Sequence, residues 1–178
     1  VRPVVVAPPV AGSVTLARGR LMLTDLRTLN SPDLQNFTEA TRQLRIDPSR
    51  QIVPFLAGDT LAALLPGLAE FRTQFGFVPR INSMGRSVQH NARVGGVRNS
   101  DHLGGRAIDF QSEALTATQK AALRNILERR GFYVLEHDVG SGMHFHASLR
   151  RRATATELAG LTVRRPVGTP PPTVTAEV

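Results

Sequence analysis

The stretch Ser100-Asp101-His102-Leu103-Gly104-Gly105-Arg106-Ala107-Ile108-Asp109 sets the pattern around which the chain is organised. Within it His102 and Asp109 lie seven residues apart, and two glycines between them let the backbone turn closely. All five histidines of the chain fall between Arg86 and His146. An imidazole and a carboxylate at this spacing, inside the histidine-rich part of the chain, predict a metal site.

A third ligand is expected from the segment 142–149. Its residues alternate as those of a strand do, so His144 and His146 point to the same face of a sheet. A catalytic zinc ion takes three protein ligands and keeps a fourth position for water. The sequence therefore predicts one zinc ion per chain, bound by His102, Asp109 and an imidazole of this strand.

Two motifs carry a resemblance to a known family: Ser100-x-His102-x-x-Gly105-x-Ala107-x-Asp109 and His144-x-His146. The chain resembles the zinc D-alanyl-D-alanine peptidases of bacterial cell walls. That family includes the VanX- and VanY-type carboxypeptidases and phage endolysins that cut L-alanyl-D-glutamate, and the hedgehog signalling domain has the same fold. The resemblance covers about half of the chain, from Leu61 to Leu149.

The resemblance implies a role for five residues. It implies His102, Asp109 and His146 as the zinc ligands. It implies Arg86 as the group that holds the carboxylate or carbonyl of the substrate, for which a planar, permanently charged guanidinium is suited. His144 would activate the zinc-bound water or stabilise the tetrahedral intermediate.

The general base departs from the family pattern. Family members with a Glu-x-x-His or Asp-x-x-His arrangement place this base three residues before the last ligand. In this chain that position is Met143 when counted from His146, or Ser141 when counted from His144. The nearest carboxylates are Glu136 and Asp138, and of the two we slightly favour Asp138. A glycine-rich loop can fold either acid over the zinc, or either can be a solvated strand end.

The remaining two histidines are not assigned to the site. His90 lies in a polar loop, where we expect an exposed side chain that can touch substrate at the rim. His137 shows no register with His144 and His146, so we expect it away from the zinc.

Composition narrows the class of protein. The chain has 178 residues, 41% hydrophobic and 20% charged, which is typical of a globular protein with one sizeable core. It has no cysteine, so disulfides and thiol catalysis are excluded. The net charge of +8 favours acidic polymers as partners. With 5% aromatic residues, no tryptophan and no nucleic-acid-binding signature, nucleic acid is not expected, and no apolar run is long enough to span a membrane.

Hydrophobic periodicity predicts an α+β fold, with helices on one face of a small antiparallel sheet and the metal on the other. We expect strands at 77–82, 106–110, 132–136 and 144–149, the last two as a hairpin. A helix is expected from Ser31, its N-cap, to Asp47. Asp59 is expected to cap a short helix that Pro66 interrupts. A helix at 116–130 begins with a capping box.

The chain divides into four expected parts. Residues 1–12 form a proline-rich arm, 13–57 a helical extension, 58–152 the zinc peptidase-like domain, and 153–178 an extension with a proline-rich tail. Both termini can attach to partner proteins, although disordered tails are the simpler interpretation.

The function expected from these observations is zinc-dependent hydrolysis of a peptide bond in peptidoglycan stem or cross-link peptides, by a carboxypeptidase or an endopeptidase. The alternative is a non-catalytic zinc-binding module, for example a component of a phage tail or injection particle. The expected location is outside the cytoplasm, in the periplasm or cell wall, or within such a particle. The bond that is cut depends on the shape of the pocket, which the sequence does not show.

Overall fold

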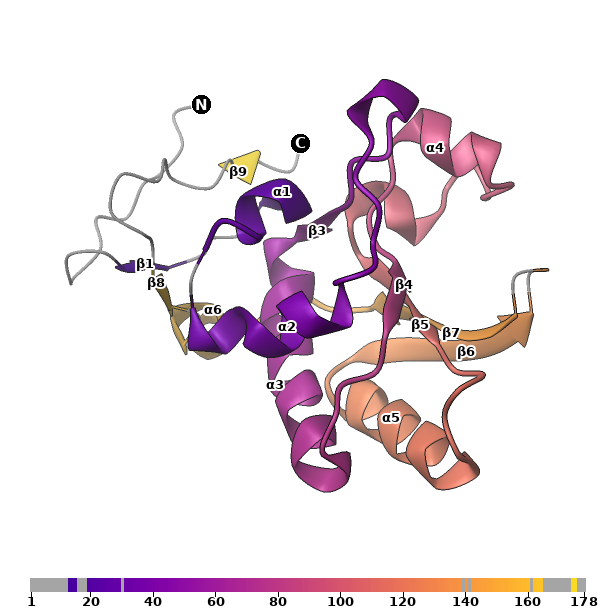
Figure 1. The fold of residues 1–178 in the computed structure, drawn as a ribbon. Helices are drawn as coiled ribbons and strands as arrows, with labels where there is room; N and C mark the ends of the chain where they lie inside the picture. Colours follow the sequence, from indigo (N-terminus) through magenta and orange to yellow (C-terminus); the bar gives the residue numbers. More distant parts are fainter. Residues whose placement is uncertain are drawn as a thin grey trace.

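The structure is a computed structural model that describes residues 13–15, 19–29, 31–138, 140, 142–160, 162–164 and 174–175. The proline-rich arm expected at 1–12 lies outside these ranges, as does most of the expected proline-rich tail. The described chain combines helices with small antiparallel sheets (Figure 1), which confirms the α+β class. No helix in the described part is both long and apolar enough to cross a bilayer.

The helices are α1 (Leu23–Leu26), α2 (Gln35–Ala40), α3 (Gly58–Phe75), α4 (Val88–Arg93), α5 (Ala117–Arg129) and α6 (Ala155–Gly160), with 3-10 turns η1 (Pro32–Leu34), η2 (Pro48–Arg50) and η3 (Asp101–Gly104). The strands are β1 (Ser13–Thr15), β2 (Arg20–Met22), β3 (Phe55–Ala57), β4 (Ile81–Ser83), β5 (Ala107–Gln111), β6 (Phe132–Asp138), β7 (Met143–Leu149), β8 (Thr162–Arg164) and β9 (Val174–Thr175).

The main sheet has the strand order β4-β5-β7-β6, and every neighbouring pair is antiparallel. Successive side chains of a strand point to opposite faces, so the sheet has two different surfaces. On one face Phe110 pairs with Phe145, and both are buried in the core. On the other, which we call the histidine face, Asp109 pairs with His146. In Figure 1 strands β6 and β7 run between α5 and α4.

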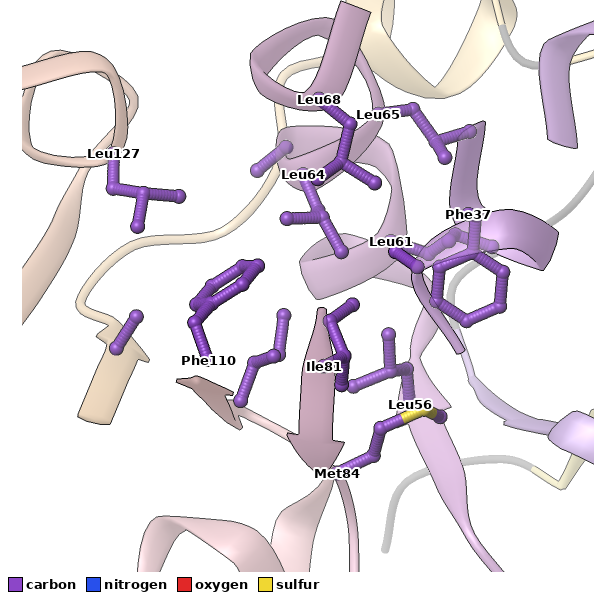
Figure 2. Close-up of a cluster of buried hydrophobic side chains, with 14 of the residues drawn as sticks. Phe37, Leu56, Leu61, Leu64, Leu65, Leu68, Ile81, Met84, Phe110 and Leu127 are labelled. Carbon is purple, nitrogen blue, oxygen red and sulfur yellow. The ribbon is translucent and has the colours of Figure 1, made fainter. Parts of the chain in front are cut away.

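Helix α3 is the centre of the hydrophobic core. Figure 2 shows Leu61, Leu64 and Leu68 of this helix above Ile81 and Phe110 of the sheet. All of these side chains are at most 1% exposed. Burying each contributes roughly 1.5–3 kcal/mol relative to leaving it in water. The helix and one face of the sheet therefore form a single apolar layer, which leaves the histidine face free for chemistry.

The chain before α3 belongs to the same core. Leu21, Leu34 and Phe37 are buried within the cluster that also contains the residues of α3 and the main sheet. Strand β2 pairs with β3 and with β9, and β1 pairs with β8. The four-part division expected from the sequence stays a prediction.

Helix α3 is one continuous helix, so the expected interruption at Pro66 is wrong. A proline inside a helix removes one main-chain hydrogen bond. Pro66 lies on the exposed side, while Leu65 and Leu68 are buried and hold the helix against the core. Asp59 does not cap the helix either, because its buried carboxylate accepts a hydrogen bond from the main-chain nitrogen of Ala153 at 2.8 Å.

The helix expected from Ser31 to Asp47 is much shorter in the structure. Ser31 caps the 3-10 turn η1, since its hydroxyl accepts from the main-chain nitrogen of Asp33, and helix α2 follows this turn and ends at Ala40. The Arg27 guanidinium donates to the main-chain carbonyls of Thr41 and Leu44 at 2.9 and 3.0 Å. A side chain from elsewhere in the fold thus binds the carbonyls that a longer helix would have used.

Other local predictions are confirmed. The capping box of α5 is present, with Thr116 as the N-cap and Gln119 as its partner. The expected hairpin forms from β6 and β7.

Strand β4 is shorter than the expected 77–82, because Pro79 has no N–H to donate to a neighbouring strand.

Gly105 controls how the chain passes from His102 into β5. It ends η3 with φ of 67°, in the left-handed region that favours glycine. A Cβ built on it would lie 2.6 Å from the main-chain nitrogen of Ala57 and 3.0 Å from the carbonyl carbon of Leu56. Neither backbone atom can move aside, so only glycine allows this close approach.

We predict that Gly105→Ala destabilises the fold by about 3 kcal/mol, because left-handed backbone and steric overlap each cost about 1–2 kcal/mol or more. The matched control is Gly104→Ala, whose new Cβ would have its nearest neighbour, the Arg106 side chain, at 3.8 Å. Urea unfolding of both variants measures the difference. Equal midpoints for the two variants would contradict the prediction.

Candidate metal centre

The three predicted ligands meet on the histidine face. Asp109 of β5 lies directly opposite His146 of β7 in the antiparallel ladder, and η3 brings His102 to the same place. The Nε2 atom of His102 and the Nδ1 atom of His146 lie 3.2 and 3.0 Å from Oδ1 of Asp109. One ligand atom from each residue lies within 4.8 Å of the others, so the group can hold a metal ion.

A main-chain carbonyl fixes the orientation of the His102 ring. Its ring is 2% exposed, and its Nδ1 lies 2.7 Å from the main-chain carbonyl of Met84. A carbonyl only accepts, so Nδ1 donates, and in its neutral form the ring presents the lone pair of Nε2 to Asp109. The hydroxyl of Ser100 accepts from the main-chain nitrogen of His102 and caps the turn.

This arrangement fits a cation. A nitrogen lone pair and a carboxylate oxygen at 3.2 Å repel each other unless positive charge lies between or beside them. Two imidazoles and one carboxylate are also the donor set of many catalytic zinc sites. The ligand residues therefore fit a zinc ion on their geometry and on their chemistry.

Asp109 is a buried carboxylate that remains ionised. Burial by itself would raise its pKa, but contact with His102 and His146 in their protonated forms and the charge of Arg86 outweigh this effect. The pKa of Asp109 is therefore held well below its ordinary value. An ionised carboxylate oxygen is one of the ligands that zinc takes in proteins.

Arg86 reaches the site from the segment that follows β4. A bulge between Ile81 and Ser83 brings Ser83 opposite Asp109, and Ser83 accepts a hydrogen bond from Arg86 Nε at 2.9 Å. The Nη2 of Arg86 donates to Oδ2 of Asp109 at 2.8 Å. Burial lowers the pKa of Arg86, and the charge of Asp109 opposes that shift. The structure thus brings Arg86 to the centre, while its role in substrate binding stays a prediction.

Two further histidines flank the ligand group. His144 lies on the same face as His146, and His137 lies directly opposite His144 across the hairpin. The ring centroid of His137 is 4.5 Å from that of His144 and 6.3 Å from that of His146. Burial first, and then the nearby charges of His144 and His146, lower the pKa of His137 and favour its neutral form.

His137 is the site residue that the sequence did not indicate. The signal was the register of the hairpin, which pairs Glu136 with Phe145 and His137 with His144. Strand alternation alone leaves the register open, because a shift by one residue exchanges the two faces.

The two candidate carboxylates are not part of the ligand group. Glu136 lies on the opposite face of β6 from His137, where its Oε1 accepts from Ser112 and from Lys120, both at 2.8 Å. These contacts lower its pKa, the bond from Lys120 most of all. Asp138 is exposed at the end of β6, where its Oδ1 accepts from Gly140 N at 2.7 Å. The structure does not bring Glu136 to the metal centre, and it uses Asp138 to close the turn.

A cavity of about 170 Å³ opens beside Arg86. Arg45 and His90 add polar groups to its wall, and its apolar lining includes Ile52 and Met84. His90 lies in α4 and is half-buried, rather than exposed as expected. Burial, and then the charges of Arg86 and Arg93, lower its pKa.

A protein-family model described as peptidase M15 matches residues 35–147. The matched segment is more than half of the chain and includes all three ligands, His144, His137 and Arg86. The chain belongs to the peptidase M15 family. No curated protein matches it. Membership of the peptidase M15 family makes the chain a metallopeptidase. The ligand group on its histidine face agrees with this assignment.

We predict that Glu136→Gln leaves metal binding unchanged and lowers stability at pH 7 by roughly 1 kcal/mol, because it weakens two hydrogen bonds on the far face. The folded-state pKa of Glu136 is depressed, so its contribution is present above the unfolded pKa and is lost as pH falls through the folded value. Urea unfolding at pH 7 and pH 3 should show a smaller difference at pH 3 than at pH 7. A loss of metal from the variant would contradict this assignment.

Proposed function

We propose that this chain is a zinc-dependent peptidase that hydrolyses a peptide bond in peptidoglycan stem or cross-link peptides, of the D,D-carboxypeptidase or endopeptidase type. The observation that carries the proposal is the meeting of His102, Asp109 and His146 on one sheet face of a peptidase M15 chain. Zinc supplies a Lewis acid there and lowers the pKa of bound water toward about 7.

His144 is the residue to which we assign proton transfer. It is 7% exposed and follows the hairpin turn, with its Nδ1 3.3 Å from the carbonyl of Gly142. A carbonyl accepts, so Nδ1 donates and Nε2 is left to take a proton from the attacking water. The same nitrogen can return that proton to the leaving amine. His137 packs on this ring and limits its rotation.

Arg86 and the adjacent cavity form the proposed substrate-binding side. Asp109 and Ser83 engage Nη2 and Nε of the guanidinium, which fixes its plane. A guanidinium held this way can bind a carboxylate or carbonyl of a peptide without losing further side-chain freedom. The cavity of about 170 Å³ can receive a small side chain. Short stem peptides with free carboxylates have this chemistry.

The proposed setting is outside the cytoplasm, in the periplasm or cell wall, or within a phage or phage-like particle. The net charge of +8 supports it, because a basic protein concentrates near anionic wall polymers. Partner proteins at the proline-rich termini remain part of this proposal.

A specific observation favours one alternative, a zinc-binding module without turnover. Glu136 faces away from the ligand group and Asp138 closes the hairpin turn, so neither carboxylate is held at the position of a general base. A chain that relied on such a base would bind zinc and peptide without cutting.

Substitution of the two strand histidines should separate metal binding from proton transfer. We expect His146→Ala to lose zinc and activity together. We expect His144→Ala to keep zinc within a few-fold and to lose about 100-fold or more in kcat, which is typical of a removed acid–base group. Zinc content and peptide turnover measured on the same samples test this. If His144→Ala keeps full activity, the proton-transfer role is wrong.

The deciding experiment is digestion of purified peptidoglycan by protein as isolated, protein stripped with a chelator, and stripped protein given zinc back, with products read by mass spectrometry. We expect stem-peptide fragments that vanish on stripping and return with zinc, and their masses identify the bond. One bound zinc per chain with no cleavage would refute the peptidase and favour the binding module.

A further inference from the structure

The imidazole of His146 has a second polar partner on the side away from the ligand group. Its Nε2 lies 3.0 Å from Oγ of Ser148, and this hydroxyl lies 2.8 Å from Oδ2 of Asp101. Ser148 is completely buried, two residues after His146 on the same face of β7. Asp101 is the first residue of η3, the turn that also carries His102. A hydrogen-bonded chain therefore links one ligand to the turn that holds another.

The number of protons on each of these side chains decides which group donates and which accepts. An ionised carboxylate only accepts, and the Arg150 guanidinium lies 3.5 Å from Oδ2 of Asp101. Ser148 gives its single proton to Asp101 and keeps only lone pairs for His146. Nε2 of His146 must then donate. In the neutral ring this leaves Nδ1 with its lone pair directed at Asp109, 3.0 Å away.

We propose that Ser148 and Asp101 are positioning residues for the metal. They hold His146 in the Nε2–H tautomer and fix the orientation of its ring, so that Nδ1 is presented to the ion. Hydrogen bonds of this kind commonly orient metal-binding histidines and raise their basicity. Neither residue belongs to the ligand group, and Ser148 lies one residue beyond the segment that matches the family. The inference rests on the zinc ion of the proposed function.

The three ligands differ in how they are supported. His102 is oriented by a main-chain carbonyl, that of Met84, and Asp109 by the guanidinium of Arg86. No side-chain substitution removes the first support, and changing Arg86 would alter the proposed substrate-binding side as well. The link through Ser148 and Asp101 can be broken by substitutions that change neither a ligand residue nor Arg86 on the proposed substrate-binding side. It is therefore the support that a substitution can test cleanly.

The test compares zinc affinity in the full chain, measured by competition with a chromogenic chelator and without substrate. We expect Ser148→Ala and Asp101→Ala to bind zinc about 10–100-fold more weakly than the unmodified protein. The matched control is Ser112→Ala. Ser112 is equally buried, and its hydroxyl donates to Glu136 over the same 2.8 Å, but on the far face. We expect its zinc affinity to stay within about threefold.

A second measurement separates positioning from general stability. In the zinc-free protein, the ¹⁵N chemical shifts of the His146 ring report which nitrogen carries the proton. We expect the Nε2–H tautomer in the unmodified chain and in Ser112→Ala, and a mixture of tautomers in Ser148→Ala and Asp101→Ala. A purely structural role for Ser148 would lower the unfolding midpoint and leave the tautomer as it was.

Three results would overturn the inference: zinc affinity within threefold of the unmodified protein in both variants, an equal loss in Ser112→Ala, or an unchanged His146 tautomer. If Ser148→Ala does not fold, Asp101→Ala carries the test, because the Asp101 side chain is 36% exposed and its removal leaves no buried gap. Zinc alone is the probe. A chain that binds zinc as expected and cuts no peptidoglycan therefore refutes the proposed function without affecting this inference.

Discussion

The buried carboxylate of Asp109 is the constraint on which the rest of the site depends. A buried negative charge is costly unless donors and positive charge surround it. Here Oδ2 accepts from a guanidinium, and Oδ1 faces two imidazole nitrogens with which it can share a cation, so three different segments of the chain meet at this carboxylate. These contacts keep the pKa of Asp109 low, which keeps the carboxylate ready for a cation. The turn η3, strand β7 and the bulged end of β4 all converge on this one group.

The two faces of the main sheet explain how a small fold supports such a site. One face carries Phe110 and Phe145 into the core beneath α3, which provides the stability. The other face carries the ligands and the flanking histidines. A shift of one residue in the β6–β7 register would exchange His137 with Glu136 and bring a lysine-bound carboxylate to the histidine face. The hydrophobic core thus fixes the chemistry of the opposite face, because apolar residues at alternate positions permit only one register.

All three ligands are oriented by hydrogen bonds to groups outside the ligand set. Each ligand is oriented from behind by a group that is itself held: a carbonyl for His102, a guanidinium for Asp109 and a hydroxyl for His146. A metal ion binds more tightly when its ligand side chains are already held in place, because the entropy cost of ordering those side chains has been met when the protein folds. The Asp101–Ser148 link also ties η3 to β7. A metal ion bound at this centre would therefore be coupled to the conformation of the His102 turn through the fold.

The sequence by itself determined the features that depend on neighbouring residues. The spacing of His102 and Asp109 and the alternation of His144 and His146 predicted a metal site with one histidine of the strand, and the family resemblance implied His146. The sequence also predicted the capping box at Thr116, because such patterns arise from local backbone geometry. The structure alone decided that α3 continues through Pro66, that α2 ends at Ala40, that His137 joins the site while Glu136 does not, and that Asp101 reaches Ser148. Each of these depends on packing or pairing between segments far apart in the chain, and local patterns leave such contacts undetermined.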